Sequence, residues 1–219
     1  MSSRKKYLES TSRRVFSRAK TSFATSIIRF GNNAGYKAGG CTTSTTRKWA
    51  SKCTPTSLVD PSGMGRWSGL EFFGSGGRRL SFLTVYRSVR ASDKQTSTYH
   101  SQQVAILSSK GYSSPNPQCQ CLSDLSDFIQ PIIDDPLHEI VVCIDANESL
   151  HTKSSAIRDF MEGSNLFDLH SGLHDSPSSP VWTYHDDHHS SRIDFMFGFL
   201  HTYEALSRAG YTLPDRHPL

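Results

Sequence analysis

This chain lacks acidic residues over most of its first quarter: no Asp or Glu occurs between Glu9 and Asp60. Residues 1–52 hold twelve Lys and Arg against that one acid, a balance of +11, whereas the remainder holds 12 basic and 19 acidic residues, a balance of −7. The overall charge of +4 is therefore the sum of a basic N-terminal segment and an acidic remainder. A basic segment suits a polyanionic partner, because Lys and Arg neutralise phosphate charge. A solvated helix face is the alternative reading of the first twenty residues.

Cysteine pairs and long apolar runs are also lacking. The five cysteines are odd in number and none has Cys-x-x-Cys spacing, which indicates neither a disulfide framework nor a zinc knuckle. A reducing compartment, nuclear or cytoplasmic, is therefore expected. No apolar run approaches the roughly 18 residues of a membrane span, and the N-terminus has no apolar segment of a secretory signal. We expect no membrane partner.

Length and periodicity indicate one α/β domain with a basic N-terminal segment. At 219 residues and 36% hydrophobic, the chain is long enough to bury one substantial core. Apolar residues near helical spacing predict an amphipathic helix over 6–28. We therefore divide the chain into a basic helical segment, 1–30, and a domain over 31–219.

Strands and helices alternate through the rest of the chain. Strands are predicted at 39–46, 66–73, 80–86, 140–144, 181–184 and 193–197, and helices at 102–109, 119–133 and 153–162. Hairpins mixed with helical crossovers predict a layered α/β sandwich, with two packed mixed sheets flanked by helices.

One stretch, Glu139 to Glu148, carries the clearest chemical signal. A run of β-formers ends at Asp145, and Asn147 follows two residues later, which places a carboxylate and an amide on the same face at a sheet edge. An ordinary Asx turn is the alternative for this pair. Downstream, Asp194 lies in an apolar strand, where a buried carboxylate needs a partner. We favour a functional role for Asp194 over a structural pair with Arg192.

The other polar or glycine-rich segments can be explained without a functional role. Asp168 is expected to be a loop carboxylate, and Tyr86 fits a strand position as well as a functional one. The cluster His185-Asp-Asp-His-His189 is contiguous and lacks the spacing of a tetrahedral metal site, so we predict a solvated loop. Gly74-Ser-Gly-Gly77 lacks the Lys-Ser/Thr of a phosphate loop, so we predict a hairpin.

Taken in order, three segments resemble the endonuclease/exonuclease/phosphatase superfamily of abasic-site and DNase-I-type nucleases. They are Ile144-Asp-Ala-Asn147, Arg192-Ile-Asp-Phe195 and Pro214-Asp-Arg-His-Pro218. Residues 83–87, Leu-Thr-Val-Tyr-Arg, resemble the strand whose Tyr reaches the substrate phosphate. Lys48-Trp49 and Gly63-Met-Gly-Arg-Trp67 are similar to endonuclease-like reading frames of retroelement origin. The likeness covers roughly residues 10 to 219, and it depends on the order and spacing of these pieces together.

The resemblance implies hydrolysis of a phosphodiester, in DNA, with Mg²⁺ or Mn²⁺ as cofactor. Asp145 would align and deprotonate the attacking water, and Asn147 and Tyr86 would donate hydrogen bonds to the phosphoryl oxygens. His217, held by Asp194, would carry positive charge near the transition state. Asp215 would help to bind the metal ion.

The chain departs from the family pattern in two places. The Asn strand and the metal-binding Glu strand expected near the N-terminus are not found, so we expect the first strands to be missing. The closing motif carries one extra residue before His217, which would turn that side chain to the opposite face. We expect activity to be lost or reduced unless another chain supplies the missing part. The alternatives are a catalytically silent nucleic-acid-binding or interaction protein and a phosphomonoesterase or sphingomyelinase-like hydrolase on the same fold.

Overall fold

A computed structural model describes residues 19–26, 39–90, 98–171, 182–185 and 190–205 of the chain. Its main sheet is mixed and six-stranded. In spatial order the strands are β3 (Leu58–Val59), β4 (Trp67–Phe73), β5 (Arg79–Tyr86), β6 (His138–Asp145), β10 (Asp194–Gly198) and β7 (Phe167–Asp168). Only the central pair, β5 and β6, is parallel; the other neighbours are antiparallel. This mixed sheet with its helices confirms the predicted α/β class.

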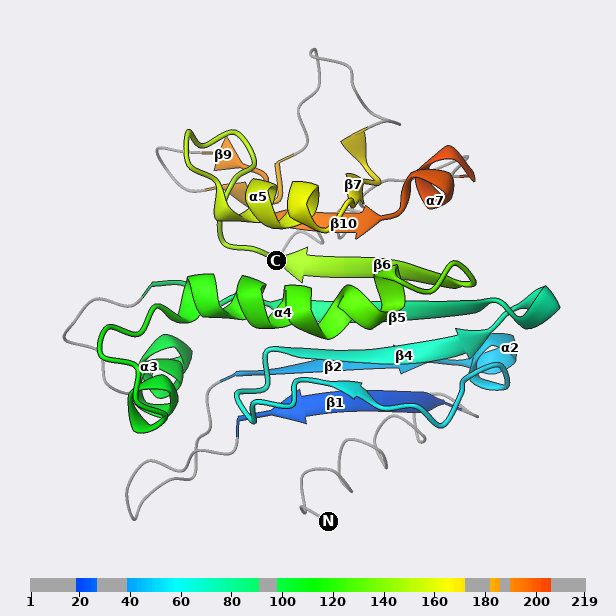
Figure 1. The fold of residues 1–219 in the computed structure, drawn as a ribbon, viewed down its shortest axis with the longest axis horizontal. Coiled ribbons are helices and arrows are strands. Elements are labelled where there is room, and N and C mark those ends of the chain that lie inside the picture. The colour runs from blue at the N-terminus through cyan, green and yellow to red at the C-terminus, as the bar shows by residue number, and fades with distance from the viewer. Residues whose placement is uncertain (1–18, 27–38, 91–97, 172–181, 186–189, 206–219) are drawn as a thin grey trace, which may run out of the picture.

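The described helices are α2 (Arg47–Ala50), α3 (Tyr99–Ser109), α4 (Pro117–Ile133), α5 (Ala156–Gly163) and α7 (Leu200–Ala205), with a 3₁₀ turn, η1 (Ser75–Gly77), between β4 and β5. Of these, α4 and α5 supply apolar side chains to the core on one face of the sheet. Figure 1 shows α4 lying along β5 in front of the sheet. None of the helices in the described ranges is long and apolar enough to cross a membrane.

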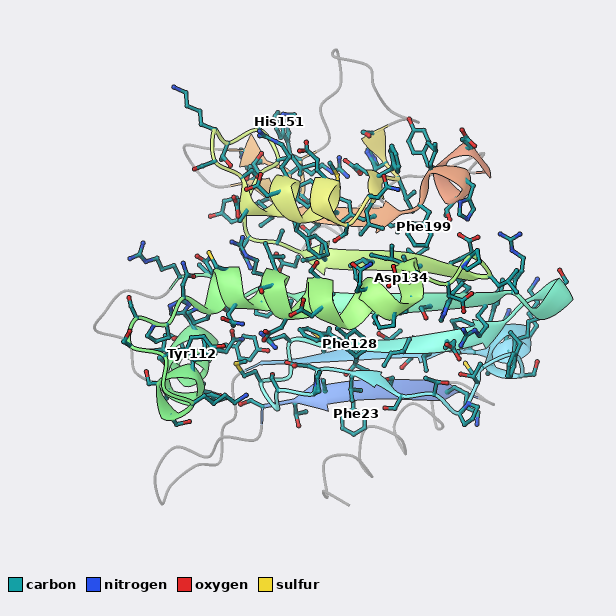
Figure 2. All side chains as sticks on the ribbon, in the orientation of Figure 1. Phe23, Tyr112, Phe128, Asp134, His151 and Phe199 are labelled. Atoms are coloured by element: carbon teal, nitrogen blue, oxygen red, sulfur yellow. The ribbon has the colours of Figure 1, made fainter. Side chains whose placement is uncertain are left out.

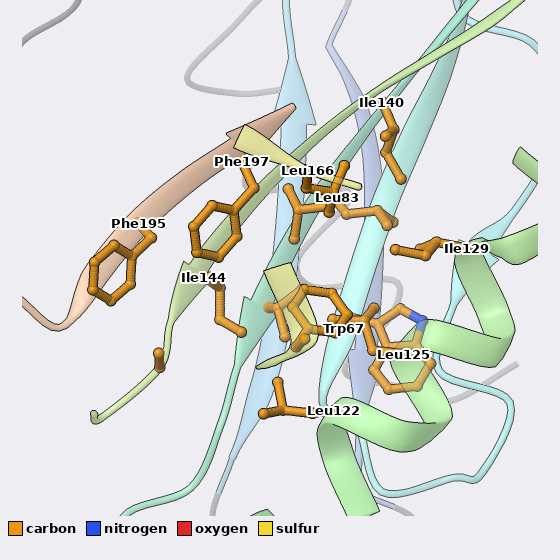
Figure 3. Packing of buried hydrophobic residues seen from close by; sticks show 14 of the residues in the cluster. Trp67, Leu83, Leu122, Leu125, Ile129, Ile140, Ile144, Leu166, Phe195 and Phe197 are labelled. Atoms are coloured by element: carbon orange, nitrogen blue, oxygen red, sulfur yellow. The ribbon is translucent and has the colours of Figure 1, made fainter. Parts of the chain in front are cut away.

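The core lies between α4 and the sheet. α4 begins at Asn116, whose side chain accepts hydrogen bonds from the backbone of the first turn, and Pro117 occupies the first helical position. Leu125 and Ile129, four residues apart on one face, are fully buried. They face Trp67 and other apolar side chains of the sheet (Figure 3). Alternate residues of β6 point the same way, so its remaining side chains face the other side of the sheet.

A second, two-stranded sheet packs on that other side. β1 (Lys20–Thr25) and β2 (Gly40–Thr45) pair antiparallel and lie against β4, while β2 also reaches β5. The contact is made by small polar groups: the Thr43 hydroxyl lies 2.9 Å from the Ser68 carbonyl oxygen and 3.0 Å from the Thr84 hydroxyl. Hydrogen bonds between small polar side chains therefore help to join the two layers.

The prediction of a helix over residues 6–28 is wrong for residues 20–25, which form β1. Ser22 and Ala24 are buried while their neighbours are more exposed, which is the alternation of a strand. Ala19, Phe23 and Ile27 have helical spacing, but pairing with β2 decides the structure here. Periodicity over a short stretch of sequence is weak evidence compared with strand pairing in the folded protein. The rest of that predicted helix lies outside the described residues, and the division of the chain at residue 30 stays a prediction.

Most other predicted elements are confirmed. Strands occur at 40–45, 67–73, 79–86 and 138–145, and helices at 99–109, 117–133 and 156–163. Gly74–Gly77 joins β4 to β5 as predicted. The strand predicted at 181–184 is limited to β8 (Tyr184–His185), paired with β9 (Ser190–Ser191). All five cysteines are free thiols.

An ion pair is buried beside the core. The Arg66 guanidinium binds the Asp60 carboxylate at 2.9 Å and Asp124 at 2.7 Å, and the side chains of Arg66 and Asp60 are at most 1% exposed. Burial by itself raises the pKa of Asp60, but the hydrogen bonds and charge of Arg66 outweigh it, and the net pKa is lowered. Arg66 also lies over the Trp67 ring, 4.7 Å from its centroid.

Arg66→Ala should destabilise the protein by about 3–5 kcal/mol, because it leaves a buried carboxylate without its cation. Urea unfolding followed by circular dichroism measures this free energy. The double variant Asp60→Asn/Arg66→Met removes both charges and should lose much less. A single variant that costs under about 1 kcal/mol would contradict a buried, interdependent pair.

Candidate active site

Two carboxylates lie side by side at one end of the main sheet. β6 and β10 pair antiparallel, and their register places Asp145, the last residue of β6, directly opposite Asp194, the first residue of β10. Both are half-buried. Directly paired residues on one face of antiparallel strands lie close enough to interact. The structure thus brings together two of the predicted site residues that are 49 positions apart in sequence.

These carboxylates border a groove on the face of the sheet opposite α4. The groove has a volume of about 470 Å³, with walls formed by β5, β6 and β10 on one side and the start of β2 on the other. Tyr86, Asp145 and Asp194 line it, together with Gly40 of β2 and His170 beyond β7. Its remaining lining is Cys41, Thr42, Thr84, Val85, Cys143, Ile144, Phe195 and Met196. It is a concave, mostly apolar pocket with a few polar groups, as ligand sites usually are.

Asp145 is electrostatically perturbed. Its pKa is raised from 3.8 to about 6, first by burial and second by the negative charge of Asp194, while a backbone hydrogen bond from Asn147 opposes the rise. A neighbouring negative charge disfavours the ionised form of a carboxylate. A carboxylate with a pKa near neutrality and access to a groove has the properties of a general base.

Asn147 sits on a tight turn after β6. Its φ is +50°, in the left-handed region that Asn tolerates better than most residues. Its backbone N–H donates to Asp145 Oδ1 at 3.3 Å, which is the predicted Asx turn, and its side-chain Nδ2 donates to the Arg87 carbonyl at 2.6 Å. The predicted Asx turn is therefore present, and it carries the two candidate site residues Asp145 and Asn147. One amide hydrogen anchors the turn, and the second is not required for that anchor.

A clamp made by Arg87 and Glu148 holds this turn. The buried Arg87 guanidinium donates to the Ala146 carbonyl at 2.9 Å and to Glu148 Oε2 at 2.6 Å. Glu148 Oε1 accepts from the N–H of Ala156, at the start of α5. Sequence reasoning assigned no role to either clamp residue. The sequence feature that could have identified them is an Arg directly after one strand and a Glu three residues after another, where the two strands end at the same edge.

Tyr86 ends β5 opposite Asp145, across the parallel β5–β6 pair. Its ring stacks on that of Tyr99, with centroids 5.5 Å apart, and it lines the groove. Its pKa is raised, first by burial and second by the charge of Asp145, while a hydrogen bond with the Asn147 side chain lowers it. Tyr86 therefore stays protonated and able to donate at neutral pH.

Asp168 supports β10, whereas the sequence predicted a loop carboxylate. It is buried in the short strand β7 and accepts two hydrogen bonds from Arg192, at 2.6 and 2.7 Å. Sequence spacing alone did not link these residues, because the link depends on pairing of β7 with β10. Thr183 adds a second support, since its hydroxyl accepts from the backbone N–H groups of Ile193 and Asp194. The start of β10, and with it Asp194, is fixed from both sides.

The two remaining predicted site residues, His217 and Asp215, lie outside the described residues. So do residues 186–189 of the His/Asp cluster, while His185 is exposed and bonds Ser190 at 2.6 Å. The ranges that the structure describes contain no group of three or more His, Cys, Asp or Glu arranged to hold a metal ion. They do offer two adjacent carboxylates, and Mg²⁺ is commonly bound by one or two carboxylates together with water and substrate phosphate. Asp145 and Asp194 fit that donor set.

Asp145→Asn should raise the stability of the fold at pH 7.5. The folded pKa of about 6 lies above the ordinary value of 3.8, so the stabilising contribution of Asp145 is full below 3.8 and is lost as pH rises through about 6. With allowance for partial exposure, removing the charge gains about 1–2 kcal/mol, or roughly 3–6 °C in the thermal midpoint. The gain should be absent near pH 4. Equal gains at both pH values would contradict the electrostatic origin.

Comparison with known proteins identifies the fold. No protein-family sequence pattern matches the chain, and no curated protein sequence is significantly similar to it. The human Nocturnin catalytic domain with bound sulfate superposes with a TM-score of 0.53 at 14% identity, over 89% of this chain and 64% of that one. A humanized D. rerio TDP2 with 14 mutations gives 0.50 at 14% identity, over 89% and 66%. The chain thus spans just under two thirds of the length of each. It shares the DNase-I-like fold of these two proteins.

Proposed function

We propose that the Asp145–Asp194 site hydrolyses phosphodiester bonds in DNA with the help of a divalent metal ion. One observation carries this proposal: two carboxylates are paired in register at the end of a groove, and one of them has a pKa raised to about 6. The motif order in the sequence and the DNase-I-like fold support the same reaction class. The narrower likeness to retroelement endonucleases rests on the sequence motifs alone.

In this mechanism Asp145 accepts the proton of the attacking water. Ionised Asp145 is held in place by the N–H of Asn147, and the Arg87–Glu148 clamp fixes the turn that carries both residues. Attack on a phosphodiester builds negative charge on the phosphoryl oxygens, and preorganised neutral donors stabilise that charge. The Tyr86 hydroxyl lines the groove and is the first such donor. The Asn147 amide, which is hydrogen-bonded to Tyr86, is the proposed second donor.

A divalent ion would be held by Asp194, with Asp215 as a further candidate ligand, so that Asp145 stays available to accept the proton. When bound, such an ion neutralises charge on the phosphate. His217 remains the candidate for a cationic group near the leaving oxygen.

DNA is favoured as substrate by the charge distribution. The balance of +11 over residues 1–52 provides sequence-independent attraction to a polyanion, which a small phosphomonoester does not need. The same residues could instead hydrolyse a small phosphomonoester. A parallel assay with such a substrate, run beside the plasmid assay, tests this alternative.

Asp145→Ala should lower metal-dependent nicking of supercoiled plasmid by at least about 100-fold, since a general base contributes 10²–10⁴. The assay compares Mg²⁺, Mn²⁺ and EDTA with the full chain. The matched control is Asp127→Ala, which removes an exposed carboxylate from α4 on the opposite face of the sheet. Cleavage of p-nitrophenyl phosphate in place of plasmid would indicate the phosphomonoesterase. A folded chain that binds plasmid but leaves it intact would make it a silent binder.

Nicking should also depend on pH in a defined way. Because Asp145 must be ionised to act and its pKa is about 6, the rate should fall about tenfold per pH unit below 6 and level off above it. Initial rates at constant ionic strength and saturating metal ion test this. A profile that is flat between pH 5 and 7 would exclude Asp145 as the base.

A further inference from the structure

A cationic, aromatic surface lies at the far end of the sheet from the candidate active site. It consists of Trp49 with Lys48 and Lys52, and of Lys20 and Arg47 beside them; we call it the Trp49 surface. Trp49 is 47% exposed. The amino groups of Lys48 and Lys52 lie 5.9 and 5.6 Å from the centroid of its ring. Few described side chains combine so large an apolar ring with flanking positive charge.

The position of this surface follows from the two-stranded sheet. Gly40, at the start of β2, borders the groove, whereas α2 follows the other end of β2. Figure 1 shows α2 and the C-terminal end of β6 at opposite ends of the sheet. β5, eight residues long, runs between these ends, a distance of about 25 Å at 3.3 Å per residue. The Trp49 surface is therefore separate from the Asp145–Asp194 site.

The Trp49 surface is held in place by the strands beneath it. The Trp49 ring meets Phe72 of β4 edge-on, with centroids 6.0 Å apart and planes at 81°. The N–H of Lys52 donates to the Trp49 carbonyl, and the N–H of Phe73 donates to the Lys52 carbonyl. An aromatic ring anchored in this way loses little conformational freedom when it binds a ligand.

The positive charge of this surface is not neutralised within its own part of the fold. No acid occurs between Glu9 and Asp60, so β1, β2 and α2 carry no negative side chain. The nearby Glu71 is buried and bonds Thr56, and it also pairs with Arg79. In the part of the chain that the structure describes, no carboxylate forms an ion pair with Lys20, Arg47, Lys48 or Lys52.

We propose that the Trp49 surface binds single-stranded nucleic acid, with Trp49 stacking on a base and the flanking lysines contacting phosphates. Clustered cations are complementary to a polyanion. An exposed tryptophan flanked by cations suits a ligand that presents both phosphates and flat π-faces, which single strands do and a polyphosphate does not. Bases within an intact duplex are already stacked on each other and unavailable to the indole.

The test measures binding of the full chain to a fluorescein-labelled oligothymidylate of about 12 nucleotides, within the usual range of single-strand site sizes. All proteins carry Asp145→Ala, so that cleavage does not interfere, and failure of the proposed hydrolysis leaves this experiment intact. Trp49→Ala should weaken binding by about 5- to 100-fold, whereas Trp49→Phe, which keeps a stacking ring, should lose less. Lys48→Ser/Lys52→Ser should reduce the slope of log affinity against log salt by about 0.7 for each phosphate that the lysines no longer neutralise.

The matched control is Tyr112→Ala/Lys110→Ser, which removes another exposed aromatic residue and its neighbouring lysine. Tyr112 lies beside α3, at the end of the molecule opposite α2 (Figure 2). Its removal should leave affinity within about twofold. Intrinsic fluorescence gives a direct readout, because the oligonucleotide should quench a component that Trp49→Ala abolishes. Thermal midpoints establish that each variant is folded.

Several outcomes would overturn the proposal. Unchanged affinity in Trp49→Ala, or an equal loss in the Tyr112 control, would show that the ring does not stack. Equal loss of polyglutamate binding in Trp49→Ala would indicate an acidic polypeptide as the ligand. If the chain bound duplex DNA as tightly as oligothymidylate, and Trp49→Ala did not change that affinity, binding would be due to general electrostatic attraction alone.

Discussion

The parallel pairing of β5 with β6 is the constraint on which the rest of this structure depends. Parallel neighbours cannot be joined by a tight turn, so the chain must cross over between them, and here it does so through α3 and α4. That crossover supplies the helix that buries Leu125 and Ile129 against the sheet. The same pairing brings the C-terminal ends of both strands to one edge, where Tyr86 faces Asp145. One topological feature thus creates both the core and the edge at which the candidate site residues meet.

The two faces of the sheet divide these tasks. Large apolar side chains occupy the α4 face, whereas the opposite face carries Thr84, Cys143 and the two carboxylates. The second sheet covers β4 and β5 and leaves the groove over β6 and β10. Because this groove partly desolvates Asp145 beside Asp194, the free energy that raises the Asp145 pKa comes from its position. The ionised form of Asp145 therefore costs the fold stability above about pH 6, at the candidate active site.

The sequence predicted the main sheet well, because its strands are long and rich in β-formers. Asp145, Asn147 and Asp194 were identified from short motifs, and the register of β6 with β10 confirms that the two carboxylates adjoin. Supporting residues were harder to predict. Arg87 acts on a turn about sixty residues away, and Asp168 reaches Arg192 only through strand pairing, so neither contact leaves a local pattern. β1 was missed for a similar reason. Its apolar alternation is too short to predict a strand, and the strand forms because it pairs with β2.

The small polar contact between the sheets has a consequence for local opening. Thr43, Ser68 and Thr84 join β2 to the main sheet through hydroxyl groups, and such a contact buries little apolar area for each residue. Segments with few buried apolar contacts open at lower free energy than the global unfolding transition. The β1–β2 layer is thus the part of the fold best suited to separate transiently, with its amide protons exchanging before those of β6, while α4 and the central strands remain folded. A wall of the groove would then be a dynamic boundary rather than a fixed one.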